Sequence, residues 1–339
     1  MLFRSGLQCY HKDDQIKVNI LTPAGDQLKT EIKDTKNGKY TVTYTPQCAG
    51  QHRVGMQVNG QPLTGSPWVV QVLHQYQFAF QFGSTEKGQG EFIQPWAIAV
   101  SKKTGTIAVA NPENERIQMF SCDGNFLREI VPNNYHPNFV TETGDFLAYF
   151  AVGDDDRLSL FTESGQFITH VSHTHLKEPF FLSVGSDSRI ITCDMADKKV
   201  KVLSPDGKDL LLSFSAPGCD SFPWCAVYHQ DKFFVSYVEA HCVKVFNKAG
   251  VYLYDIGSEG SGDGQLSKPT GIVIDKFNHL IVCDSGNERL QLFALDGRIF
   301  TKMEGQFFDN SGLLTAAAVS NDGHLFVTDY EKNCIYVFH

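Results

Sequence analysis

The fold follows from one stretch, PTGIVIDKFNHLIVCDSGNERLQLFALDGRIF, which spans residues 269–300. Short apolar runs at 270–274, 280–282, 289–293 and 298–300 alternate with polar turns. The dipeptide Asp296-Gly297 separates the last two runs, and Asp-Gly between apolar runs is a strong hairpin signal. The stretch therefore predicts four short antiparallel strands.

The same unit recurs along the chain. Copies begin at Pro95, Pro137, Pro179, Pro223, Pro269 and Leu314, which are 42 to 46 residues apart. This period is typical of four-stranded propeller blades. The sixth copy ends at Phe338 after its third strand, so it needs a fourth strand from elsewhere to avoid an unpaired edge. Residues 76–82 have the pattern of a fourth strand and precede the first copy, so we expect them to close a six-bladed ring.

Residues 16–72 do not follow this repeat and show a different spacing of apolar runs and turns. Two Asn-Gly dipeptides, at 37–38 and 59–60, predict hairpins. Between them Tyr40, Val42 and Tyr44 alternate with threonines, which indicates a strand with one apolar face. We predict a small β-sandwich over residues 1–74 and a propeller over residues 75–339, which makes the chain all-β.

Composition excludes several classes of protein. No apolar stretch reaches the roughly 20 residues of a membrane helix, and the first residues lack the features of a signal peptide, so we expect a cytoplasmic protein without a membrane partner. Nine scattered cysteines with no Cys-x-x-Cys pair favour reduced thiols over disulfides or zinc modules. Residues 1–74 carry a net charge of +3 and residues 75–339 a net charge of −12, which disfavours phosphate binding by the propeller except at a local basic face.

Two family resemblances follow from these motifs. The stretch NGKYTVTYTPQCAGQHRVGMQVNGQPLTGSPWVVQV resembles the C-terminal half of a filamin-type immunoglobulin-like repeat, although the segment before Ile16 is short for such a domain. The copies PTGIVI…LIVCDSGNERLQLF…LDG and NERIQMF…CDG resemble NHL repeats. A filamin-type domain directly before six NHL repeats resembles the C-terminal region of TRIM-NHL proteins.

The resemblance implies a role in ubiquitination. TRIM-NHL proteins belong to the RING-type ubiquitin ligases and carry RING, B-box and coiled-coil segments, and a coiled coil would make the parent protein dimeric. None of these segments is found in this sequence, and the zinc modules would need closely paired cysteines. We therefore expect no catalytic residue and no cofactor, and we interpret the chain as a module that selects a protein substrate or adaptor. The alternative is recognition of a folded RNA stem-loop on a propeller face.

Two repeated positions are candidates for partner binding. The basic position of the N-x-R-I-Q motif is occupied in the six blades by Arg116, Arg157, Lys199, Cys242, Arg289 and Cys334. Resemblance to RNA-binding NHL domains implies that such residues hold phosphates, because guanidinium groups pair with phosphate. Nearby carboxylates, among them Glu113, Asp197 and Glu288, offer each basic residue an ordinary structural ion pair instead.

The second position follows the opening proline of each blade. It holds the aromatic residues Trp96, Phe180 and Trp224. These side chains either fill the central channel as core residues or meet a ligand at its mouth, and burial is the more common outcome for aromatic residues. Three histidines at 170, 173 and 175 lie close in sequence, but they have no neighbouring cysteine pair, so we expect no metal site.

Overall fold

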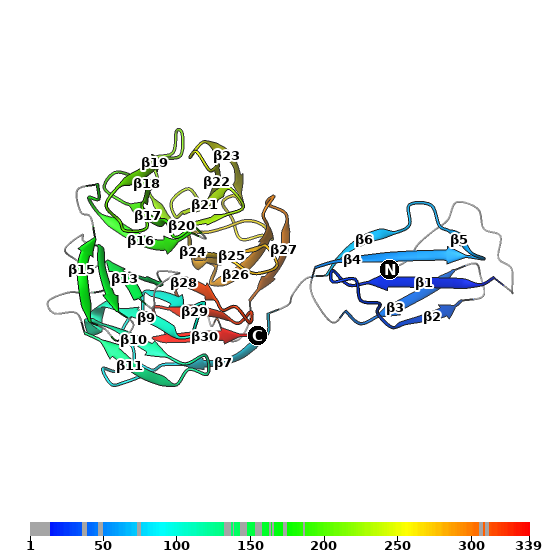
Figure 1. The fold of residues 1–339 in the computed structure, drawn as a ribbon, viewed down its shortest axis with the longest axis horizontal. Helices are drawn as coiled ribbons and strands as arrows, with labels where there is room; N and C mark the ends of the chain where they lie inside the picture. The colour runs from blue at the N-terminus through cyan, green and yellow to red at the C-terminus, as the bar shows by residue number, and fades with distance from the viewer. Residues whose placement is uncertain are drawn as a thin grey trace. The chain divides into compact units, whose positions relative to one another are not determined.

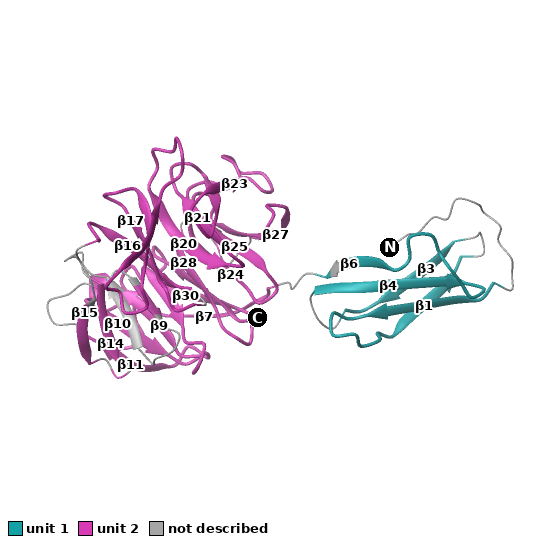
Figure 2. Cartoon of the chain, turned by 45° about the horizontal axis from the view of Figure 1, so that its top comes forward, with its two compact units in different colours: residues 1–75 teal, residues 76–339 magenta. Residues whose placement is uncertain are grey.

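The structure is a computed structural model, and it forms two compact units, residues 1–75 and 76–339 (Figures 1 and 2). It describes residues 14–35, 39–46, 50–72, 76–131, 137, 139–142, 148–152, 158–162, 164, 166–171, 175–185, 187–304, 308 and 312–339. Within these ranges the regular elements are β-strands and two 3₁₀ turns. The predicted fold class, an all-β chain with a small two-sheet unit followed by a six-bladed propeller, is confirmed.

The described residues of the first unit form two sheets. In the larger sheet, β4 pairs with β1, β5 and β6, whereas β2 pairs only with β3 in the smaller one. The strands are β1 (Ile16–Leu21), β2 (Thr30–Asp34), β3 (Tyr40–Tyr44), β4 (Gly50–Val58), β5 (Gln61–Pro62) and β6 (Trp68–Val72).

Alternation of apolar and polar residues explains which side of β4 is buried. Val54 and Met56 are buried, whereas Arg53 and Gln57 on the other face are exposed, because successive strand residues point to opposite sides. Val42, Tyr44 and Trp68 pack against this core. Asn59 and Gly60, which connect β4 to β5, both have positive φ, as a two-residue hairpin turn requires. The predicted Asn37-Gly38 turn lies outside the described residues.

The second unit contains six four-stranded antiparallel sheets, the blades, arranged around a centre. Figure 1 shows the inner strands β16, β20, β24 and β28 nearest that centre. Blades 1 to 3 consist of β8 (Ala97–Val100), β9 (Ile107–Asn111), β10 (Arg116–Phe120) and β11 (Phe126–Ile130); β12 (Phe139–Glu142), β13 (Ala148–Val152), β14 (Leu158–Thr162) and β15 (Phe167–Val171); and β16 (Pro179–Val184), β17 (Ile190–Asp194), β18 (Lys199–Leu203) and β19 (Leu210–Phe214).

Blades 4 to 6 continue the ring. They consist of β20 (Pro223–His229), β21 (Lys232–Tyr237), β22 (Cys242–Asn247) and β23 (Tyr252–Ile256); β24 (Pro269–Ile274), β25 (His279–Asp284), β26 (Arg289–Ala294) and β27 (Ile299–Met303); and β28 (Leu314–Val319), β29 (Leu325–Asp329), β30 (Cys334–Phe338) and β7 (Phe78–Phe82). The 3₁₀ turns η1 (Pro112–Asn114) and η2 (Ser285–Asn287) join the second and third strands of blades 1 and 5.

The sixth blade combines the two ends of the unit. Strand β7 pairs antiparallel with β30, so that Phe82 lies opposite Ile335 and Phe78 opposite Phe338. The hydroxyl of Tyr76, just before β7, donates a hydrogen bond to Asp275 in blade 5 (3.3 Å). Because β7 pairs with β30, the last strand of the chain is not left as an open edge, and β7 becomes the outer strand of the sixth blade.

Side chains join neighbouring inner strands directly. The Ser183 hydroxyl on β16 donates to the carbonyl of Ala226 on β20 (2.6 Å). The Cys225 thiol on β20 donates to the carbonyl of Ile272 on β24 and accepts its N–H. The inner wall is thus held together by hydrogen bonds that the blade sheets themselves do not provide.

Candidate partner-binding face

One face of the propeller is built from two sets of loops. The first set connects the outer strand of one blade to the inner strand of the next, and the second, which includes η1 and η2, joins the second and third strands of a blade. Both sequence-predicted positions lie at this face: the described basic residues, Arg116, Lys199 and Arg289, begin third strands, and the aromatic residues lie at the start of inner strands. We call it the loop face.

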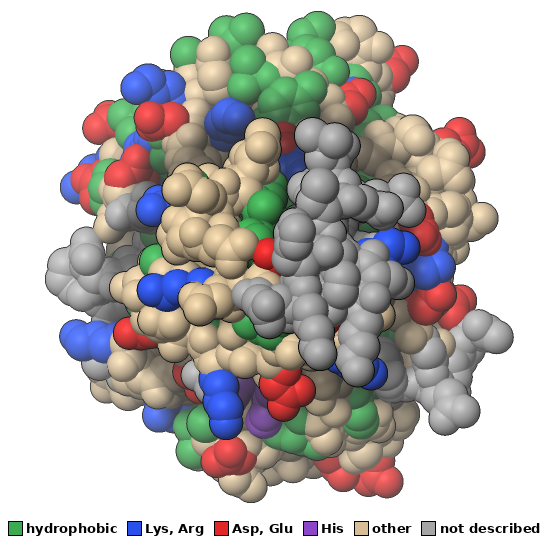
Figure 3. All heavy atoms as spheres, turned by 90° about the vertical axis from the view of Figure 1, so that its right-hand side faces the viewer, with side chains coloured by type: hydrophobic (Ala, Val, Ile, Leu, Met, Phe, Trp, Pro, Cys, Tyr) green, Lys and Arg blue, Asp and Glu red, His purple; other side chains and the backbone are tan. Residues whose placement is uncertain are grey.

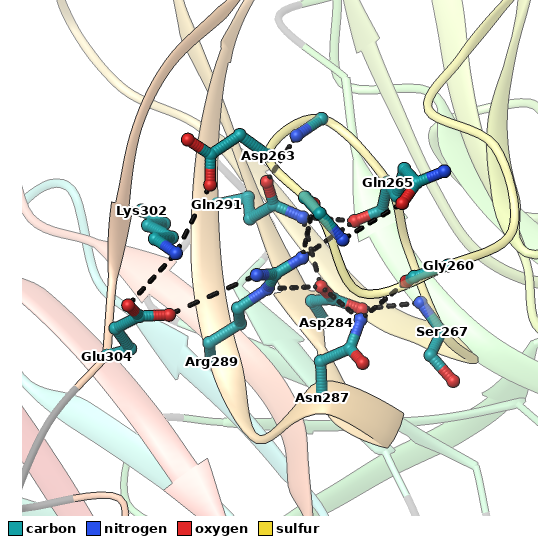
Figure 4. A network of polar contacts seen from close by, with 12 residues as sticks. Gly260, Asp263, Gln265, Ser267, Asp284, Asn287, Arg289, Gln291, Lys302 and Glu304 are labelled. Carbon is teal, nitrogen blue, oxygen red and sulfur yellow. Dashed lines mark hydrogen bonds and ion pairs between the residues drawn. The ribbon is translucent and has the colours of Figure 1, made fainter.

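Arg289 points into the protein at the loop face (Figure 4). Only 3% of its surface is exposed. Its Nε donates to Asp284 Oδ2 (2.8 Å), and its Nη2 donates to the carbonyls of Gly262 and Gln265 (2.8 and 3.0 Å). Glu304 lies 4.0 Å from its Nη1. The guanidinium group is therefore occupied in holding the loop before β24.

The partner carboxylate explains why this arrangement is rigid. Asp284, fully buried at the end of β25, accepts the backbone N–H of Ser267 (2.6 Å). Its other oxygen also accepts hydrogen bonds from Asn287 and Gln291 (2.9 and 3.0 Å). A buried carboxylate is tolerated because it is paired and fully hydrogen-bonded. This network ties the loop to the second and third strands of blade 5.

Arg116 has the same role in blade 1. It donates to Glu129 (2.9 Å) and to the carbonyls of Lys87 and Gly88 (2.8 and 2.6 Å). Its side chain is 11% exposed. The partner, Glu129, lies on β11, and it is not one of the loop carboxylates that the sequence suggested.

The other basic positions differ. Lys199 begins β18 and is exposed, and Arg157 lies outside the described residues. In blade 3 the buried cation is Lys201, whose Nζ donates to Asp194, Asp197 and the carbonyl of His175. Hydrogen bonds from Lys177 and then Lys201 lower the pKa of Asp197 to about 2. A binding role for the basic positions therefore stays a prediction.

The aromatic positions come together. Trp96, Phe180 and Trp224 are half-buried neighbours: the ring centroids of Phe180 and Trp224 are 4.6 Å apart, and each lies 6.0 Å from that of Trp96. A fourth ring, Tyr330, stands at 5.0 Å from Trp96 in an edge-to-face arrangement. These four residues, which we call the aromatic cluster, come from blades 1, 3, 4 and 6 and gather at the loop-face end of the central channel.

Tyr330 was missed by the sequence reasoning. It follows the aspartate that ends β29, and the corresponding residues after Asn111, Asp194, Tyr237 and Asp284 are not aromatic. A comparison of this loop position among the blades would have singled it out. In blades 5 and 6 the position that holds Trp96, Phe180 and Trp224 in other blades is occupied by Thr270 and Thr315. Both threonines are buried and hydrogen-bonded.

Two carboxylates lie near one ring of the aromatic cluster, Tyr330. Burial, followed by the negative charges of Glu113 and Glu331, raises the pKa of Tyr330. Both carboxylates belong to exposed loop residues. Figure 3 views the molecule from the right-hand side of Figure 1, and so does not look along the central channel; on that side Lys and Arg side chains are interspersed with Asp and Glu.

Metal binding finds no support among the described residues, where no group of three His, Cys, Asp or Glu side chains is placed to hold an ion. His170 contacts Ser159 (3.0 Å) and packs on Phe167, whereas His173 lies outside the described residues. Within the same described part of the chain, no helix is long and apolar enough to cross a membrane.

Two family models match the sequence. The Filamin/ABP280 repeat matches residues 5–69, and a 6-bladed beta-propeller family matches residues 226–314. Curated relatives include the E3 ubiquitin-protein ligase TRIM71 of Rattus norvegicus, 35% identical over 119 residues, and protein lin-41 of Caenorhabditis elegans, 27% identical over 120 residues. The chain thus combines a filamin repeat with a 6-bladed beta-propeller, and about a third of it is similar to TRIM71 and lin-41.

The matches to TRIM71 and lin-41 are partial. Each covers 33% of this chain but only 14% of rat TRIM71 and 10% of lin-41, so the chain spans a small part of these relatives. Solved structures share the fold: a protein of unknown function from Bacteroides thetaiotaomicron aligns over 95% of this chain and 90% of its own (TM-score 0.64, 15% identity).

Virginiamycin B lyase from Staphylococcus aureus also shares the fold, over 77% of this chain and 84% of its own (TM-score 0.56, 14% identity). At such identities the likeness concerns the fold alone. The described residues that line the pocket between the inner strands include neither His nor a carboxylate.

Proposed function

We propose that this filamin–propeller chain is a non-catalytic recognition module, and that its loop face binds a protein segment at the aromatic cluster. The observation that carries the proposal is the convergence of four half-buried rings from four blades beside the carboxylates of Glu113 and Glu331. Aromatic side chains at the centre of a surface often supply most of the binding energy of an interface.

The chemistry of the site defines the partner. An apolar or aromatic side chain would pack on the exposed ring faces, and a flanking Lys or Arg would be attracted by Glu113 and Glu331. Because the relatives include a protein named as an E3 ubiquitin-protein ligase, we propose that the bound protein is a ubiquitination substrate or an adaptor.

RNA is the second candidate, and the geometry favours it less. A basic ring would need accessible cations, but the guanidinium groups of Arg116 and Arg289 are occupied by backbone carbonyls and carboxylates. Lys199 remains exposed. The carboxylates beside the aromatic cluster would repel a phosphate backbone.

The test uses two defined probes. A random peptide library displayed on phage is selected against the chain, and a labelled pool of stem-loop RNA is titrated in parallel at low and moderate salt. We expect peptides that combine an aromatic or aliphatic residue with Lys or Arg. Binding of these peptides should fall at least tenfold, by analogy with interface hot spots, in the variant Trp224→Ala.

Substitutions of exposed charged residues test binding without disturbing the folded core. Glu113→Lys and Glu331→Lys change exposed residues and should also weaken the selected basic peptides, whereas Asp209→Lys, in an exposed turn of blade 3 outside the loop face, should not. Peptides without basic residues, or peptides insensitive to both kinds of variant, would contradict the proposal. Salt-sensitive retention of the RNA pool with no peptide selected would favour the second candidate.

A further inference from the structure

Tyr330, the fourth ring of the aromatic cluster, lies beside two carboxylates. It follows β29 in blade 6, and its ring meets that of Trp96 edge-to-face, with the centroids 5.0 Å apart. Glu331 is the next residue along the chain, and Glu113 belongs to η1 of blade 1. The ring and the two carboxylates therefore come together where blade 6 adjoins blade 1.

Contacts between blades 1 and 6 hold these groups in place. The backbone N–H of Trp96 donates to the carbonyl of Ala110 (3.0 Å), two residues before η1 begins. The backbone N–H of Gln94 donates to Asn333 Oδ1 (2.6 Å), which ties the loop before β8 to the loop after β29. The side chain of Gln94 also hydrogen-bonds to the hydroxyl of Tyr330. The ring of Tyr330 is therefore fixed relative to both loops.

The chain itself does not neutralise these carboxylates. Glu113 and Glu331 are exposed, and neither forms an ion pair with a Lys or Arg in the part of the chain that the structure describes. Burial and then their negative charges raise the pKa of Tyr330, and no cation is among the charges that act on it. Arg116, which follows η1, donates to Glu129 and to two carbonyls of its own blade. Uncompensated negative charge thus lies beside a partly exposed ring.

This combination suits a flat cation. A guanidinium group stacks on an aromatic ring through its face and donates hydrogen bonds to carboxylates from its edge. The ammonium group of lysine is more strongly hydrated and has no flat face, so it gains less from the ring. A trimethylated lysine is attracted to aromatic rings but has no N–H to donate to a carboxylate. Arginine is the side chain that uses both the ring and the carboxylates.

We propose that the loop face accepts an arginine side chain of its protein partner, with the guanidinium group over the ring of Tyr330 and its N–H groups directed at Glu113 and Glu331. This inference rests on the proposed function and makes it more specific, because the basic residue that the loop face selects is arginine and not lysine. The apolar residue of the partner then packs on the other rings of the aromatic cluster.

Four defined peptides test the proposal on the whole chain. They are acetyl-Gly-Leu-Gly-Arg-Gly-amide and its counterparts with lysine, trimethyl-lysine or citrulline, the uncharged isostere of arginine, in place of arginine. Nuclear magnetic resonance of the indole N–H groups reports binding, because Trp96 and Trp224 lie in the aromatic cluster whereas Trp68, the third tryptophan of the chain, lies in the first unit.

We expect the arginine peptide to shift the indole signals of Trp96 and Trp224 in a saturable way and to leave the signal of Trp68 in place. The lysine, trimethyl-lysine and citrulline peptides should bind at least about fivefold more weakly, because each lacks the flat face, the donors or the charge. Lysine or trimethyl-lysine that binds as tightly as arginine overturns the inference.

Variants of exposed residues locate the site. The double variant Glu113→Gln, Glu331→Gln should weaken the arginine peptide and leave the citrulline peptide unchanged, and Tyr330→Leu should remove the preference for arginine over lysine. Glu115→Gln is the matched control, because this exposed carboxylate of the same loop does not act on Tyr330. A double variant that keeps the full preference for arginine overturns the inference.

Failure of this inference differs from failure of the proposed function. If the four peptides bind the aromatic cluster equally, the arginine site is wrong and the peptide-binding face stands. If none of them shifts Trp96 or Trp224, the arginine site is also wrong, and the peptides selected from the phage library then decide whether the loop face binds protein at all.

Discussion

At the scale of single residues, the basic residue that begins the third strand of a blade is buried in one blade and exposed in another. Arg289 and Lys199 both begin the third strand of their blade, and each lies opposite the aspartate that ends the second strand. Arg289 is buried against Asp284, whereas Lys199 is exposed and Lys201 pairs with Asp194 instead. The same sequence motif therefore marks a structural ion pair in blade 5 and a surface residue in blade 3.

This difference makes a prediction about stability. Arg289→Ala should lower the free energy of unfolding of the propeller by about 3 kcal/mol, because it leaves the buried Asp284 without its cation. Arg289→Lys should recover only part of the loss, since an ammonium group cannot reproduce the fork of contacts to Asp284, Gly262 and Gln265. Urea denaturation measures both. Lys199→Ala is the matched control and should change little; an equal loss there would contradict the assignment.

The sequence predicted residue positions better than residue roles. It placed Trp96, Phe180 and Trp224 at the start of inner strands because the repeat fixes that register. It could not show that Tyr330 joins them, since this ring comes from a different loop position. Nor did it identify the carboxylates that pair with Arg116 and Arg289, because these partners, Glu129 and Asp284, lie on neighbouring strands and not among the loop carboxylates that the sequence suggested.

At the scale of elements, the inner strands are joined by buried side chains as well as by packing. Cys225 on β20 is fully buried and bridges to Ile272 on β24. Burial raises the pKa of the Cys225 thiol well above its ordinary value of 9.0, and that of Cys193 likewise. The sequence indicated reduced thiols. It could not show that the Cys225 thiol forms hydrogen bonds with the backbone of the next blade, because that contact depends on how two blades pack together.

The raised thiol pKa values predict a loss of stability in alkali. Above pH 9 the unfolded chain releases thiol protons that the folded chain retains, so the unfolded state is favoured as pH rises, by at most about 1.4 kcal/mol per pH unit for each such thiol. Unfolding free energies measured between pH 8 and 11 should decline less steeply for Cys225→Ser, which keeps a donor and an acceptor but does not ionise there. An unchanged slope would show that Cys225 does not contribute.

The strands of a blade could be predicted best where the sequence of that blade follows the repeat most closely. Blades 1 and 5 state the four-strand pattern in full, and their strands lie where the turns indicated. Contacts between blades were not predictable in this way. Tyr76, Asp275 and His279 form a buried hydrogen-bonded group although nearly 200 residues separate the tyrosine from its aspartate partner, and no repeated position connects them.

At the scale of the whole molecule, the propeller depends on a strand from its own beginning. Strand β7 pairs with β30 in blade 6, and Phe82 also packs on Phe120 of blade 1 with ring centroids 4.9 Å apart. It therefore both completes one sheet and closes the contact between the last and first blades. Without it, β30 would expose a row of unpaired backbone groups.

Two truncated chains test this dependence. The chain 76–339 retains β7 and should unfold cooperatively, whereas the chain 83–339 should lose its cooperative transition and aggregate, because its sixth sheet is open and Phe120 loses an aromatic neighbour. Addition of a synthetic peptide of residues 76–82 should restore part of the transition by occupying the edge of β30. Thermal unfolding followed by near-ultraviolet circular dichroism, with sedimentation to detect aggregates, distinguishes the two chains. If 83–339 unfolds with the same midpoint and cooperativity as 76–339, the ring does not require its closing strand.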